Sequence, residues 1–85
     1  MKLNISPYPC TLTLKLVKHL PENVGGLVLY DNGNITMKLK IEDWEKYYIH
    51  ESCHVVQAVE KYIEQPLGDE EEAYLMQHIT TQISE

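Results

Sequence analysis

The segment His50-Glu51-Ser52-Cys53-His54 carries the side chains best suited to chemistry. His50 and His54 are four residues apart, so on a helix both imidazoles project from the same side, one turn apart. That is the spacing needed by two ligands of one tetrahedral Zn²⁺ ion. Glu51 projects from another side of the helix and can act as general base toward a metal-bound water, because the metal lowers the pKa of that water toward neutrality. The segment predicts a hydrolytic zinc site with one coordination position open for water or substrate.

A motif this short also arises by chance, so its setting decides how much it indicates. The neighbouring residues Tyr47, Tyr48, Val55 and Val56 are uncharged, and Glu51 falls within the apolar stripe of a predicted helix. A carboxylate in that stripe is costly unless it has a metal, a proton or a hydrogen-bond partner. The alternative interpretation is a pair of surface histidines and an ion-pairing glutamate on an amphipathic helix.

A small sheet is expected to precede this helix. Residues 11–17 alternate leucine with mostly polar residues, which is the period of a half-buried strand. Residues 27–30 and 35–41 flank Asp31-Asn32-Gly33-Asn34, a tetrapeptide that tolerates positive φ and so predicts a β-hairpin. Residues 1–10 contain two prolines and are interpreted as an extended arm.

The apolar period changes to 3.6 residues after the hairpin, which predicts a helix over residues 42–64 that carries the motif. Residues 65–68 (Gln-Pro-Leu-Gly) end it, and a second helix follows over residues 69–84. We therefore predict a single α+β domain over residues 1–85. Its sheet, over residues 11–41, is mainly antiparallel and consists of a strand plus a β-hairpin, and the two helices follow.

Charge is unevenly distributed along the chain. Residues 1–41 hold five lysines and two carboxylates, a net charge of +3, whereas residues 42–85 hold two lysines and eleven carboxylates, a net charge of −9. No arginine occurs in the chain, and a nucleic-acid-binding face is normally basic and rich in arginine. We therefore expect no nucleic-acid partner, and a basic partner, a peptide or a metal suits the acidic half better.

The compartment is predicted from apolar runs and cysteines. The chain opens on polar, proline-containing sequence, and its longest apolar runs are far too short to cross a membrane. Cys10 and Cys53 do not form a disulfide framework and are interpreted as reduced thiols. These features favour a cytoplasmic protein without a membrane partner.

The residues "HESCHVVQ" followed by "DEEEAY" resemble the zincin metallopeptidases, specifically the gluzincin group, small versions of which occur in phages and other mobile elements. The resemblance implies that His50 and His54 are zinc ligands, that Glu51 is the base, and that one glutamate of residues 70–72 is the third ligand. It also implies a strand at the edge of the sheet along the substrate cleft, a place that residues 35–41 fit. It assigns no residue to the oxyanion, for which the candidates are Tyr74, His78 and Tyr62.

The four acidic residues at 69–72 also have a purely structural explanation. Asp69 is a good N-cap, Glu72 stands three residues later as in a capping box, and negative charge is favourable in the first turn of a helix. Helix capping alone can therefore account for the run, and each candidate ligand has to be judged by its position on the helix.

Position on the second helix separates the candidates. Its predicted inward stripe consists of Leu75, Met76, Ile79 and Ile83. Glu72 lies near the centre of this stripe, whereas Glu70 lies about 160° and Glu71 about 100° away. If the first helix continues to residue 64, a tight turn would set His78 opposite His54, and Glu72 would reach the metal only through an extended return of residues 65–69. The order of preference for the third ligand is Glu72, then Glu70, then His78.

Two functions are compatible with these features. The first is a zinc-dependent peptidase in which Glu51 activates water and a strand edge holds an extended peptide substrate. The second is a non-catalytic zinc-binding or regulatory module, favoured by the small size and by the lack of a clear oxyanion residue. An exposed strand edge could also pair with a second copy of the chain, which would make a homo-oligomer.

Overall fold

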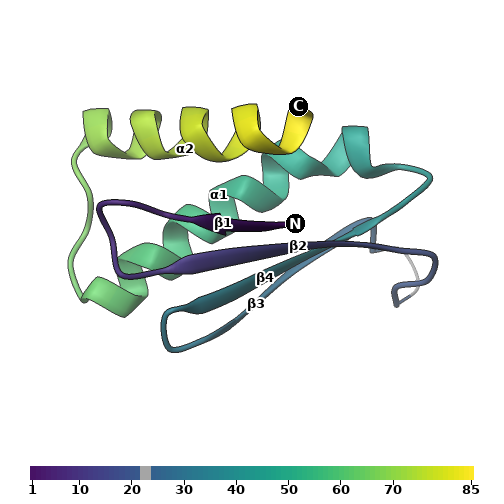
Figure 1. Ribbon diagram of the computed structural model, residues 1–85, viewed down its shortest axis with the longest axis horizontal. Helices are drawn as coiled ribbons and strands as arrows, with labels where there is room; N and C mark the ends of the chain where they lie inside the picture. The colour runs from purple at the N-terminus through teal and green to yellow at the C-terminus, as the bar shows by residue number, and fades with distance from the viewer. Residues whose placement is uncertain (22–23) are drawn as a thin grey trace.

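The computed structural model describes residues 1–21 and 24–85 and shows four strands followed by two helices (Figure 1). The strands are β1 (Lys2–Asn4), β2 (Thr11–Val17), β3 (Gly26–Asp31) and β4 (Asn34–Lys40). The helices are α1 (Trp44–Ile63) and α2 (Asp69–Ser84). The predicted α+β class, with a sheet followed by two helices, is confirmed.

The strands form one sheet in the order β1-β2-β4-β3. β1 pairs with β2 and β3 pairs with β4 in antiparallel fashion, so the sheet is mainly antiparallel as predicted. The central pair, β2 and β4, is parallel, with Leu12 opposite Ile35 and Leu14 opposite Met37. The expectation that residues 35–41 form an edge strand is wrong, because β4 lies between β2 and β3. Its alternate residues Ile35, Met37 and Leu39 are almost fully buried, which favours a central place.

The hairpin of β3 and β4 follows the sequence pattern closely. Asp31 pairs with Asn34, so the connection is the two-residue loop Asn32-Gly33, and Asn32 adopts a φ of 55°. Asparagine tolerates this left-handed conformation better than most residues do. The register that follows places Gly26, Val28 and Tyr30 of β3 on the same face of the sheet as the buried residues of β4.

Residues 1–10, expected to be an extended arm, are part of the fold. Leu3 of β1 pairs with Leu12 of β2, and the turn after β1 is closed by hydrogen bonds from the amide of Ile5 to Cys10 (3.0 Å) and from the amide of Tyr8 to Ile5 (2.8 Å). Ile5 is fully buried in the core. The arm therefore adds an edge strand and two core residues, Ile5 and Cys10, to the sheet layer.

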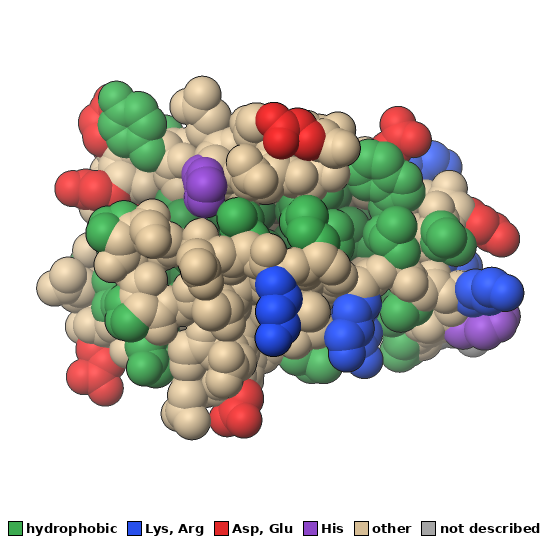
Figure 2. Space-filling model, in the orientation of Figure 1, with side chains coloured by type: hydrophobic (Ala, Val, Ile, Leu, Met, Phe, Trp, Pro, Cys, Tyr) green, Lys and Arg blue, Asp and Glu red, His purple; other side chains and the backbone are tan. Residues whose placement is uncertain are grey.

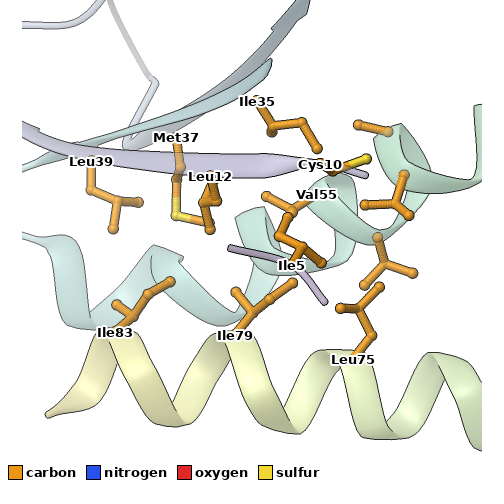
Figure 3. Packing of buried hydrophobic residues seen from close by; sticks show 13 residues of the cluster. Ile5, Cys10, Leu12, Ile35, Met37, Leu39, Val55, Leu75, Ile79 and Ile83 are labelled. Carbon is orange, nitrogen blue, oxygen red and sulfur yellow. The ribbon is translucent and has the colours of Figure 1, made fainter. Parts of the chain in front are cut away.

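The core lies between one face of the sheet and the two helices (Figure 3). Leu12, Met37 and Leu39 point from the strands toward the helices, and Ile79 and Ile83 point back from α2. α1 packs against β3 and β4, and α2 packs against α1. Figure 2 shows hydrophobic side chains along the line where α2 meets the strands below it.

Residues 64–68 separate the end of α1 from the start of α2. α1 ends at Ile63, and Glu64 follows in a left-handed conformation, with φ 58°, just before Gln65 and Pro66. α2 begins at Asp69 with Gly68 as its N-cap, so the expected capping role of Asp69 is wrong. Its four acidic residues all lie in the first turn, where they stabilise the helix dipole. Neither helix in the described part of the chain is long and apolar enough to cross a membrane.

Candidate functional site

The two histidines of the motif lie side by side on α1, as their spacing predicts. The ring centroids of His50 and His54 are 4.9 Å apart with the planes at 79°. Nδ1 of His54 lies 2.9 Å from Oε1 of Gln57, so an N–H at this position donates to the carboxamide and leaves Nε2 free. The side chain of His50 is 70% exposed. Two imidazoles open to solvent on one helix face make a donor pair for a zinc-type ion.

Glu51 is the buried member of the motif, with only 9% of its side chain exposed. Its nearer carboxylate oxygen lies 4.0 Å from Nε2 of His50, so the carboxylate stands beside the donor pair without a direct hydrogen bond to it. The side chain packs against Gly26 at the start of β3, where the absence of a Cβ makes room for it. The prediction that Glu51 falls within the apolar side of the helix is confirmed.

A groove runs between α1 and β3, with Glu51 at its centre. One hollow, of about 410 Å³, extends from Glu51 past His54 to Lys61 and is closed on the other side by β3 as far as Tyr30. A second hollow, of about 480 Å³, extends from Glu51 past His50 toward the start of α1. Because Glu51 and Gly26 line both hollows, the carboxylate divides one groove into two halves.

β3 forms one wall of this groove and lies at the edge of the sheet. Only its side facing β4 is paired among the described residues, so its other side offers backbone N–H and C=O groups to an added strand. The resemblance to zincins predicts that residues 35–41 form the strand edge beside the cleft. The edge strand that lines the groove at Glu51 is instead β3, one strand earlier in the chain.

Glu72, the preferred third ligand, is not brought to the histidines. It lies close to Glu60, whose negative charge is the main cause of the raised pKa of Glu72, with smaller contributions from burial and from the charge of Asp69. Glu60 is six residues beyond His54 and projects about 120° away from it around the helix. α1 continues to Ile63, so α2 returns along the flank of α1 that carries Glu60.

The other candidates also lie away from the motif. Glu70 is exposed in the first turn of α2. His78 and Tyr74 line a hollow between α2 and the turn after β1, and this hollow shares no lining residue with the groove at Glu51. Tyr62 packs near Gly33 at the hairpin loop. Across residues 1–21 and 24–85 no three His, Cys, Asp or Glu side chains are grouped so that they could hold a metal.

Comparisons with protein-family models, with curated proteins and with solved structures give no match. The site is therefore interpreted from its own residues.

The groove is also lined by residues that the sequence pattern did not single out, among them Gln57, Lys61, Tyr30 and Gly26. Gln57 and Lys61 follow His54 by three and seven residues, so the helical period alone could have placed them on the face of the histidines. Tyr30 and Gly26 carry no such signal, because their positions depend on which side of β4 the strand β3 takes.

Proposed function

We propose that this domain is a zinc-dependent metallopeptidase-like hydrolase in which Glu51 is the general base. The observation that carries the proposal is the place of the Glu51 carboxylate: it is buried at the centre of a groove, next to two exposed histidines and across from a free strand edge. If Glu51 served only to form an ion pair, its carboxylate would not need to lie at the centre of the groove. A plain interaction helix would not need a groove there either.

Two residues of this chain would hold the metal. His50 and His54 fit a zinc ion as imidazole donors, and Gln57 orients the ring of His54. Bound zinc supplies one chemical effect, a lowered pKa of a coordinated water. Remaining coordination positions are left for water, for substrate or for a donor that the described chain does not bring to the motif.

The remaining chemistry is that of the chain's own groups. The peptide lies extended along β3, whose free backbone groups bind it by strand addition. The carboxylate of Glu51 accepts a proton from the attacking water as the water oxygen bonds to the carbonyl carbon. It returns that proton to the amine nitrogen when the C–N bond breaks. Tyr47 lines the half of the groove that contains His50 and Glu51, and it replaces Tyr74, His78 and Tyr62 as the candidate to stabilise the oxyanion.

The proposal is tested by metal content and by cleavage of peptides. Elemental mass spectrometry of purified, untagged protein should find about one zinc per chain, lost in a His50→Ala/His54→Ala variant and kept in His19→Ala, where the histidine is exposed far from the motif in sequence. Cleavage of a peptide mixture should then be lost in Glu51→Gln, which keeps zinc and fold. Failure to bind zinc even with excess metal would overturn the proposal.

A second function is favoured by one observation. The residues predicted to stabilise the oxyanion, Tyr62, Tyr74 and His78, lie away from the motif, which suits a non-catalytic zinc-binding or regulatory module. Zinc binding without any cleavage, and without an effect of Glu51→Gln, would establish this second function instead. For either function we propose the cytoplasm as the compartment, because neither Cys10 nor Cys53 is in a disulfide.

A further inference from the structure

The two lysines in the acidic half of the chain both lie at the groove. Residues 42–85 contain eleven carboxylates and only two lysines, Lys46 and Lys61. Both line the groove: Lys46 lines the half that contains His50, and Lys61 lines the half that contains His54. Both lysines of this half of the chain therefore lie at the groove, and Lys61 also lines a neighbouring hollow with Glu60 and Glu64.

The two lysines differ in how they are held. Nζ of Lys46 lies 3.6 Å from a carboxylate oxygen of Asp43, one turn away on the same helix. Nζ of Lys61 donates to the hydroxyl of Tyr30 at 3.3 Å and lies 5.5 Å from the centre of that ring. No carboxylate of residues 1–21 or 24–85 lies within 4.0 Å of it. Tyr30 therefore positions the ammonium group of Lys61 without neutralising its charge.

The distance between Lys61 and Glu51 corresponds to the length of about four residues of an extended peptide. Ten residues separate them on α1, which corresponds to about 15 Å along the helix axis. On the opposite wall, β3 contacts Glu51 at Gly26 and Lys61 at Tyr30, four residues later, or about 13 Å of strand. An extended peptide along β3 would therefore pass from one site to the other in about four residues.

We propose that Lys61 and Tyr30 form a subsite for a carboxylate side chain of the peptide substrate, about four residues N-terminal to the bond opposite Glu51. This inference rests on the proposed peptidase function. The N-terminal direction follows from antiparallel pairing with β3, the commoner kind of strand pairing, because such a peptide runs from the Tyr30 end toward the Gly26 end. Lys61 binds the acid by a charge-assisted hydrogen bond, and the Tyr30 hydroxyl supplies a second donor.

The subsite is tested by binding, so that its outcome does not depend on turnover. Glu51→Gln protein, incubated with zinc and immobilised, is used to select from a synthetic dodecapeptide library, and the retained peptides are sequenced. Asp and Glu should be enriched about fivefold at one position. The enrichment should disappear in Glu51→Gln/Lys61→Ala and change to Lys and Arg in Glu51→Gln/Lys61→Glu. Lys15→Ala, a change on an exposed strand residue, is the matched control.

Cleavage by the wild-type protein then fixes the distance. For each cleaved peptide a matched pair with Glu or Gln four residues before the cut bond is compared, and the Glu peptide should have a kcat/KM about fivefold higher. Retained peptides without acidic enrichment, or enrichment unchanged by Lys61→Ala, would overturn the subsite. Acidic enrichment that depends on Lys61, in a protein that cleaves no peptide, would support the subsite while removing the peptidase function.

Discussion

Gly26 of β3 lies so close to Glu51 of α1 that a Cβ on Gly26 would be 2.5 Å from Cγ of the glutamate. The same Cβ would be 3.0 Å from Cδ2 of Leu39. The backbone of the edge strand β3 is therefore in direct contact with the side chain of Glu51, the candidate base. This contact fixes both the burial of the carboxylate and the width of the groove at its centre.

We expect Gly26→Ala to displace Glu51 and to abolish peptide cleavage while zinc binding by the histidines persists. Forcing a methyl group into this contact should lower the free energy of unfolding by about 1–3 kcal/mol, measured by urea denaturation. A double-mutant cycle provides the control. In a Glu51→Ala background Cγ is gone, so Gly26→Ala should cost clearly less. An equal cost in both backgrounds would contradict the contact.

Gln57 is expected to tune the affinity for zinc. Its carboxamide oxygen accepts a hydrogen bond from Nδ1 of His54 and so orients Nε2 for a metal. Gln57→Ala should weaken zinc binding about 10-fold in a competition titration with a chelating dye. Gln65→Ala, a change of an exposed residue just beyond α1, should leave the affinity unchanged. A normal affinity in Gln57→Ala would show that the ring needs no such support.

Glu72 is expected to affect stability and not the metal. Its pKa is raised, chiefly by the charge of Glu60, so between its ordinary pKa and the raised one the folded state binds more protons than the unfolded state. The free energy of unfolding contributed by this group therefore falls as pH rises from about 4.5 through that window. Urea denaturation across this window should show a smaller fall in Glu72→Gln than in the wild type.

The zinc content of the same Glu72→Gln variant tests the ligand role that sequence favoured. Because Glu72 lies beside Glu60 and away from His54, the variant should keep the zinc of the wild type. Loss of zinc specific to this variant, with the fold intact by circular dichroism, would mean that α2 shifts to bring Glu72 to the metal.

The packing of α2 on the core is expected to depend on Ile79. This side chain is fully buried, whereas Tyr74 on the same helix is 68% exposed. Ile79→Ala should lower the free energy of unfolding by about 2–5 kcal/mol, and Tyr74→Ala by less than about 0.5 kcal/mol. Equal effects of the two changes in urea denaturation would show that α2 is not anchored through this face.

Much of the local structure follows from the sequence alone. The i, i+4 spacing of His50 and His54 places their rings together because a helix fixes neighbours at that separation. Asn32-Gly33 predicts the hairpin because few other residues accept positive φ. The apolar stripe predicts the burial of Glu51. Each of these features depends on residues within one or two turns of one another, so a single stretch of sequence contains the information.

Tertiary structure decided the features that join distant segments. β4 took the centre of the sheet because its inward residues could be buried against both neighbours, and this left β3, with Gly26 and Tyr30, at the groove. α2 took the flank of α1 that carries Glu60, which separated Glu72 from the histidines. These arrangements depend on how much apolar surface each alternative tertiary structure buries in total. That total cannot be predicted from any local pattern in the sequence.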